Sequence, residues 1–306
     1  AAPGDGGSTT IGIINGSVNN NAGSLYGAKE LLHLTGVSMN TGTVQSSDGI
    51  HVNVVRGDNG SNGRYNASDA NNAFAVANYV DSPGQAVYQY CIPYGGGCVY
   101  NYYGGQSALE NDGRLQAYAR ADRGIAAAYG GVVIGALHAQ AANRNDIEAV
   151  AEAEDGSARA VGLLVRSDEG DVWLDNAEGA SIVAAAYGDD ASASAVLLSS
   201  PDYARILNAG NLVALGDGER LAIDARLTPG VSVYNSGLVV GSILGGYGDD
   251  YLYNESGGVL RLADATIDLG ASGGYGNRFE NRGLVGVDGA SSIVMGNGGA
   301  APLLPL

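Results

Sequence analysis

The chain has 306 residues, of which 50 are glycine, only two are phenylalanine and one is tryptophan. Its hydrophobic residues are mostly Ala, Val, Leu and Ile, so the composition disfavours a helical bundle and predicts a thin core of small side chains with glycine at the turns. The 32 acidic and 15 basic residues give a net charge of −17, which excludes nucleic acid as a partner because a polyanion would be repelled. No apolar run is long enough to cross a bilayer, so we expect no membrane insertion by this segment.

Residues 1–106 have an irregular texture, and residues 56–106 within them are dominated by Asn, Gly and Tyr. We expect irregular coils here, with an insertion that protrudes from the body. Cys91 and Cys98 close a short loop and are the only cysteines, so we predict a disulfide between them and hence an oxidising compartment. Zinc binding, the competing interpretation, lacks a recognised ligand spacing.

Tyrosines gather around this cysteine loop. Exposed tyrosines make binding surfaces, because each ring offers stacking area and a hydroxyl at low entropic cost. The alternative is that tyrosine only fills corners in a chain that has little phenylalanine. We predict that ligand contacts come from six of these residues: Tyr88, Tyr90, Tyr94, Tyr100, Tyr102 and Tyr103.

A five-residue phrase recurs along the chain: Asn, any residue, Gly or Asn, any residue, then Val, Leu or Ile. Seven copies begin at Asn21, Asn40, Asn111, Asn143, Asn208, Asn235 and Asn281, and looser copies with extra residues begin at Asn176 and Asn254. We expect each phrase to place a residue that tolerates left-handed backbone at a corner. Apolar residues then alternate, as in Leu115, Ala117, Ala119 and Ala121, which predicts a strand after each corner.

Two further zones follow the irregular start. Residues 107–227 form regular Ala-rich units of about 32 residues, and residues 228–306 carry shorter Gly-rich phrases that point to tighter coils. Such a unit cannot bury a face alone, whereas coiling successive units lets each strand pair in parallel with its counterparts. We therefore predict an all-β protein, one right-handed parallel β-helix over residues 1–306. A β-propeller is the chief rival, but its blades need four antiparallel strands joined by hairpins.

The repeats resemble the passenger domains of bacterial type V autotransporters, particularly pertactin-like passengers. The resemblance is carried by residues 208–212, 235–239, 246–254 and 281–285 and extends over about two thirds of the chain. It implies a β-helix that is secreted or displayed at the outer membrane of a Gram-negative bacterium, often as an adhesin, with any disulfide joining close cysteines. The family's C-terminal membrane barrel and the Gly-Asp-Ser-Gly-Ser string of its protease passengers do not occur here, so we expect a passenger alone and carry over no catalysis.

Candidate metal ligands lie near the C-terminal end. Residues 245–253 match the calcium-binding nonapeptide of RTX repeats, which makes Asp249 and Asp250 the candidates for calcium. Such sites need consecutive turns that each supply half of the ligands, and the match occurs once. The competing interpretation is a Gly-Asp turn between coils, and we expect no other cofactor.

Two pairs of carboxylates, Asp189–Asp190 and Asp249–Asp250, raise the alternative of a polysaccharide hydrolase or lyase. Both pairs follow Tyr-Gly without a cluster of basic residues, and the three histidines are scattered, so we predict no catalytic residues. The expected function is adhesion or an extracellular structural role, with host or bacterial surface glycans or proteins as partners. Self-association into a filament through uncapped coil ends is a further alternative.

Overall fold

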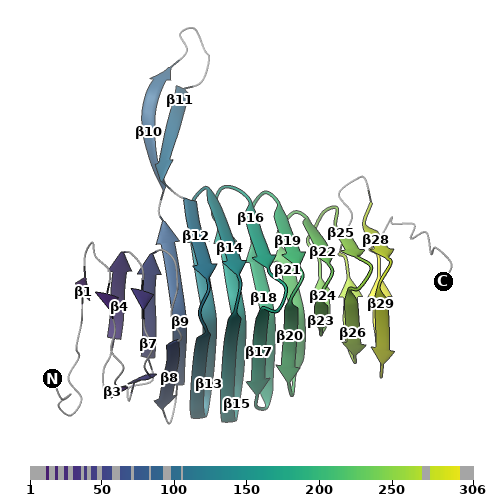
Figure 1. Cartoon of the computed structure of the whole chain (residues 1–306), viewed down its shortest axis with the longest axis horizontal. Coiled ribbons are helices and arrows are strands. Elements are labelled where there is room, and N and C mark those ends of the chain that lie inside the picture. The colour runs from purple at the N-terminus through teal and green to yellow at the C-terminus, as the bar shows by residue number, and fades with distance from the viewer. Residues whose placement is uncertain are drawn as a thin grey trace.

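A computed structural model describes residues 106–270 and 276–296, with side chains from Ala108 onward, and before them the backbone of the strands between Gly12 and Gly104. In that earlier part the only side chains described are those of Ala73, Ala75, Val76 and Ala77. Strands of successive coils pair in parallel along the whole stack (Figure 1), and β10–β11 is the one antiparallel pair in the described chain. The predicted all-β parallel β-helix is confirmed.

From β12 onward, one side of the stack is a seven-stranded parallel sheet to which each coil contributes one strand. We call it the ladder sheet, because each of its strands ends at an asparagine. Its strands are β12 (Gln106–Asn111), β14 (His138–Asn143), β16 (Val172–Asn176), β19 (Ala204–Asn208), β22 (Val231–Asn235), β25 (Tyr251–Asn254) and β28 (Arg278–Asn281).

The other sides belong to a larger sheet of nineteen strands, in which a coil adds either one long bent strand or two consecutive short ones. The long strands are β13 (Leu115–Gly135) and β15 (Asp146–Ser167). The short ones follow in pairs: β17 (Ser181–Tyr187) and β18 (Asp190–Ser199), β20 (Asn211–Gly216) and β21 (Glu219–Leu227), β23 (Leu238–Val240) and β24 (Ser242–Leu244), β26 (Val259–Ala263) and β27 (Thr266–Asp268), β29 (Leu284–Asp288) and β30 (Ser292–Val294).

The N-terminal part of the chain continues the same stack. β13 pairs with both β8 (Gly63–Asp69) and β9 (Asn72–Ser82), which therefore form one coil. The earlier strands are β1 (Gly12–Ile13), β2 (Val18–Asn19), β3 (Ser24–Tyr26), β4 (Glu30–Thr35), β5 (Ser38–Met39), β6 (Thr43–Ser46) and β7 (Ile50–Arg56). Between β9 and β12 the chain forms the antiparallel pair β10 (Gly84–Cys91) and β11 (Cys98–Gly104), which projects from the stack in Figure 1.

The asparagines that end the strands form a continuous ladder of side chains. The ladder has seven members: Asn111, Asn143, Asn176, Asn208, Asn235, Asn254 and Asn281. The Nδ2 of each of the first six donates a hydrogen bond of 2.7 or 2.8 Å to Oδ1 of the asparagine one coil further on. All but Asn281 are at most 2% exposed. Buried amides need hydrogen-bond partners, and the ladder supplies them from coil to coil. Asn21 and Asn40 lie outside the described residues.

A second row keeps the same register on the first strand after each corner. The apolar positions of the phrase are Cα partners of one another from coil to coil: Leu115, Ile147, Ile182, Leu212, Val239, Leu260 and Val285. The two rows hold although successive ladder asparagines are separated by 32, 33, 32, 27, 19 and 27 residues. Extra residues therefore lie in the segments that connect the two rows. In the loose copies at Asn176 and Asn254, they lie between the asparagine and the apolar position.

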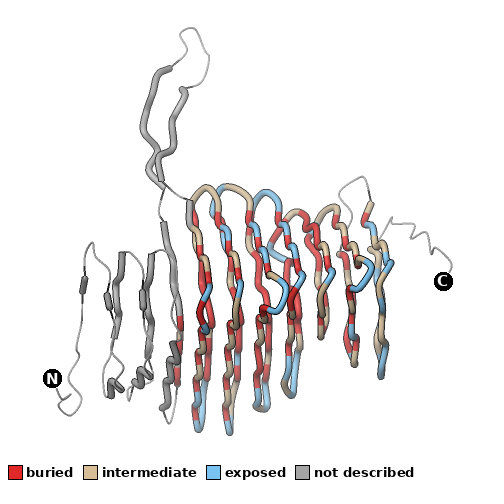
Figure 2. The backbone as a smooth tube through the Cα atoms, in the orientation of Figure 1, coloured by how far each residue is buried: buried red, intermediate tan, exposed pale blue. Residues whose placement is uncertain are grey.

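The core is tiled by small side chains that alternate along the strands. Ala117, Ala119 and Ala121 of β13 face their counterparts in β15, and all are at most 6% exposed. Buried and more exposed positions alternate along the coils in Figure 2. Side chains at the alternate positions point to the surface, which is where any binding site on the rod has to lie.

The glycines of the recurring phrase have a different role from the expected one. Gly210, Gly237 and Gly283 do not have the positive φ angles of the left-handed region. Instead, a Cβ on Gly237 would lie 2.0 Å from the carbonyl oxygen of Gly210, and one on Gly283 would lie 2.1 Å from that of Gly258. Because their φ angles are not positive, the expectation of left-handed backbone was wrong for these three glycines. Glycine is required here because successive coils approach too closely for any side chain.

Replacing Gly237 with alanine is expected to lower the free energy of unfolding by about 2 kcal/mol, because the added methyl group must push two coils apart. Gly286→Ala is the matched control, since its Cβ would meet only the carbonyl oxygen of Leu260 at 4.0 Å. Urea unfolding followed by circular dichroism measures both variants. Equal losses in the two would contradict the close approach of the coils as the reason for glycine.

Candidate functional site

The outward side chains of the ladder sheet occupy two rows, one and three residues before each ladder asparagine. From β16 onward these rows carry most of the large aromatic side chains of the sheet, together with arginines. We call this surface the aromatic face and define it as Trp173, Arg205, Leu207, Tyr234, Tyr251, Tyr253, Arg278 and, just after the last ladder asparagine, Arg282. It runs along the axis of the rod across five coils.

Three tyrosines form the C-terminal half of the aromatic face. The ring of Tyr234 meets those of Tyr251 and Tyr253 edge to face, with centroids 5.6 and 6.3 Å apart. Tyr251 and Tyr253 are stacked at 6.2 Å, with 11° between their planes. These contacts fix the rings, because edge-to-face and offset-stacked pairs are the preferred aromatic geometries.

Each of these tyrosines has an arginine guanidinium over its ring. Arg205 lies 5.5 Å from the centroid of Tyr234, Arg278 lies 5.6 Å from that of Tyr251, and Arg282 lies 5.4 Å from that of Tyr253. Arg278 also forms an ion pair with Glu280. Burial and the nearby Glu280 carboxylate raise the pKa of the Tyr251 hydroxyl, so it is a hydrogen-bond donor at neutral pH.

Trp173 marks the other half of the face and is 46% exposed. Its indole meets the ring of His138 edge to face, with centroids 5.1 Å apart. His138 Nδ1 lies 2.6 Å from Asp171 Oδ1, which fixes the imidazole in turn. Beside the indole is a pocket of about 290 Å³ whose polar lining comes from Glu110, Gln140, Asp175 and Arg205 and whose apolar lining includes Leu207.

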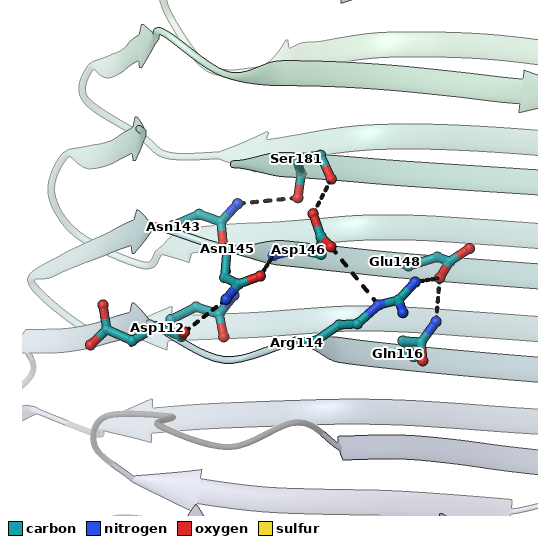
Figure 3. A network of polar contacts seen from close by, with 9 residues as sticks. Asp112, Arg114, Gln116, Asn143, Asn145, Asp146, Glu148 and Ser181 are labelled. Atoms are coloured by element: carbon teal, nitrogen blue, oxygen red, sulfur yellow. Dashed lines mark hydrogen bonds and ion pairs between the residues drawn. The ribbon is translucent and has the colours of Figure 1, made fainter. Parts of the chain in front are cut away.

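Many acidic side chains on the neighbouring side of the rod are engaged in contacts between coils. Figure 3 shows Arg114 between Asp146 and Glu148, with its nitrogens 3.9 and 3.5 Å from their carboxylates. Asp146 also accepts a hydrogen bond from the Ser181 hydroxyl at 2.6 Å, and Gln116 donates to Glu148. This network links three coils, which indicates a stabilising role for these carboxylates.

Asp249 and Asp250, the predicted calcium ligands, differ in their surroundings. Asp250 is 2% exposed; its Oδ1 accepts from the backbone N–H of Val231 at 2.8 Å, and its Oδ2 has no hydrogen-bond partner within the described residues. Burial raises the pKa of Asp250 to about 6. Asp249 is more exposed and accepts from the backbone N–H of Gly276.

Within residues 108–270 and 276–296, no three or more His, Cys, Asp or Glu side chains are grouped so that they could hold a metal ion. Calcium binding by Asp249 and Asp250 stays a prediction. The other carboxylate pair, Asp189–Asp190, lies at the turn between β17 and β18, two coils away. The fold does not bring the two pairs together.

The predicted disulfide and tyrosine contacts fall on β10 and β11. Their register places Cys91 directly opposite Cys98, as close strand neighbours, and Tyr88 opposite Tyr100. Tyr90, Tyr102 and Tyr103 face Val99, Ala86 and Gln85, whereas Tyr94 lies outside the described residues. Opposite residues in antiparallel strands have Cα atoms about 4.5 to 5.5 Å apart, a separation that a disulfide can span, so the backbone is compatible with the predicted bond.

Sequence reasoning missed the aromatic face, although a signal for it was present. Trp173, Tyr234, Tyr251 and Tyr253 stand one or three residues before a ladder asparagine, at positions that alternation directs outward. In the described part of the chain, no helix is long and apolar enough to span a membrane. The chain matches no family model, no curated protein and no solved structure.

Proposed function

We propose that this protein is a non-catalytic extracellular binding protein of the adhesin type, a β-helical rod that holds its ligand on the aromatic face. The proposal rests on one observation: Trp173, Tyr234, Tyr251 and Tyr253 gather with three arginines on one outward surface. Aromatic and arginine side chains contribute most of the binding energy at protein interfaces. Because a continuous sheet fixes their spacing, little conformational entropy is lost when a ligand binds.

The setting that we propose is the outer surface of a Gram-negative bacterium, where the rod is secreted or displayed and meets surface glycans or proteins. The resemblance of its repeats to autotransporter passengers supports this setting, and so does the predicted Cys91–Cys98 disulfide. The β10–β11 pair, with its tyrosines, is a second contact region; it projects from the stack between β9 and β12, on the N-terminal side of the aromatic face (Figure 1).

The test is binding of the labelled full chain to a printed panel of extracellular matrix proteins and cell-surface glycans. Wild type should be retained on members of the panel, and the double variant Trp173→Ala, Tyr253→Ala should lose at least about tenfold in apparent affinity. Tyr187→Ala is the matched control, because Tyr187 is 40% exposed and belongs to β17, outside the ladder sheet. Retention of the double variant at wild-type strength would count against the proposal, as would no retention of wild type.

A further inference from the structure

We infer that the pocket beside Trp173 binds one ring of a neutral glycan, with the sugar packed on the indole and its hydroxyl groups bonded to the polar side chains around it. This inference rests on the proposed function and names the class of ligand. It assigns the pocket as the specific part of the aromatic face and the tyrosines as the adjoining contact surface.

The pocket exists because a small residue stands between larger ones. In one outward row Ala142 separates Glu110 from Asp175, and Leu207 follows. In the other row Trp173 stands between Gln140 and Arg205. Neighbouring strands are about 4.8 Å apart, so the missing side chain at Ala142 leaves a hollow about two strands wide beside the indole. Its volume of about 290 Å³ is near the lower limit for small-ligand sites.

The polar groups at this hollow are available to a ligand. Gln140 and Asp175 are exposed, and within the described residues neither side chain has a hydrogen bond or ion pair. Arg205 lies over the ring of Tyr234, and its guanidinium forms no ion pair with any carboxylate of the described residues. An amide, a carboxylate and a guanidinium together offer both donors and acceptors. Gln140 and Arg205 lie on the two strands next to Trp173, one on each side. Asp175 lies two residues beyond Trp173 on the same strand.

This combination fits a sugar ring better than a wholly apolar or a charged ligand. A pyranose has C–H groups that pack on an aromatic face, and its hydroxyl groups each donate and accept at the rim of the ring. In the pocket lining the Asp175 carboxylate balances the Arg205 guanidinium, and Glu110 is neutralised by an ion pair of 3.1 Å with Arg144. The lining therefore carries no net positive charge for an anion, and the whole chain carries a net charge of −17. An anionic glycan would therefore be repelled, which selects a neutral one.

Trp173 is the only tryptophan in the chain, so tryptophan fluorescence of the full protein reports on this pocket alone. We would titrate the protein with neutral oligosaccharides built from glucose, mannose, galactose, xylose or N-acetylglucosamine, and with hexagalacturonic acid as the acidic counterpart. At least one neutral series should give a saturable shift of the emission to shorter wavelength, and the acidic one should give none. Asp175→Asn should weaken the apparent affinity about tenfold, because it removes a charge-assisted hydrogen bond. Glu178→Gln, at an exposed position in the turn after β16, should leave it unchanged.

The inference is overturned if no neutral oligosaccharide shifts the emission, if the acidic one shifts it equally, or if Asp175→Asn binds like wild type. These results separate it from the proposed function. Loss of panel binding in the Trp173→Ala, Tyr253→Ala variant, together with a silent fluorescence titration, would leave the aromatic face as the binding surface and reject only the neutral sugar. Panel binding at wild-type strength by the Trp173→Ala, Tyr253→Ala variant, together with a silent fluorescence titration, would reject both.

Discussion

Replacing Asn176 with alanine is expected to lower the free energy of unfolding by about 4 kcal/mol, because this one side chain joins three coils through buried hydrogen bonds. Asn176 is fully buried, accepts from Asn143 Nδ2 at 2.8 Å, and donates to Asn208 Oδ1 at 2.7 Å. The alanine variant removes both bonds and leaves the Asn208 oxygen without its ladder donor. Each buried polar group left unsatisfied costs about 1 to 3 kcal/mol, and the lost side-chain volume adds to this.

The ladder contains its own control at the C-terminal end. Asn281 is exposed, and its ladder bond is to Asn254, whose Nδ2 also contacts the carbonyl oxygens of Gly258 and Leu284 at 3.3 Å. Asn281→Ala should therefore cost about 1 kcal/mol or less. Urea unfolding of both variants against wild type measures the difference. Similar losses at the two positions would show that burial of the ladder is not what makes its amides stabilising.

The second large effect is a pH dependence that Asp250 gives to the stability of the protein. Burial raises its pKa from 3.8 to about 6, so the folded state binds a proton more tightly than the unfolded state. This contribution is fully present below pH 3.8 and is lost as the pH rises through about 6. Between about pH 4 and pH 7 the wild type should lose about 2.5 kcal/mol relative to Asp250→Asn, whose amide does not titrate.

Measuring the free energy of unfolding of both proteins at the two pH values isolates this contribution, because other titrating groups cancel in the difference. Asp202→Asn removes an exposed carboxylate instead and is the matched control for the substitution itself. A difference between wild type and Asp250→Asn that does not change with pH would mean that the Asp250 carboxyl titrates alike in the folded and unfolded states. A difference that grows in favour of wild type with rising pH would reverse the sign of the argument.

The parallel β-helix was predictable because its signals are local. Alternation after Leu115 and Ile147 identifies strands within a few residues, and the recurring asparagine identifies the coil. The role of the glycines was not predictable from the same pattern. A preference for positive φ belongs to one residue, whereas the constraint on Gly237 comes from a carbonyl oxygen of the preceding coil. Contacts between coils depend on register, and the sequence shows register only after the coils are aligned.

The candidate site was missed for the same physical reason. The tyrosines near Cys91 and Cys98 were predicted to contact a ligand because they are close together in the sequence. Trp173 and Tyr253 are 80 positions apart in the sequence, yet parallel stacking brings them onto one surface with Tyr234 between their coils. Residues of such a face are not clustered in the sequence, so composition over a short window does not reveal them. Aligning the phrases on their asparagines would have placed these residues in two columns and revealed it.

The ladder also has a consequence for how such a rod can diversify. The spacing between successive ladder asparagines falls from 33 to 19 residues, so up to 14 residues can enter or leave one coil while the buried rows stay aligned. Substitutions one and three residues before each asparagine change only what faces solvent, because the neighbours on either side point inward. The outward side chains of the rod can therefore be substituted coil by coil while the interior stays unchanged, so that new ligand specificities can arise without a new fold.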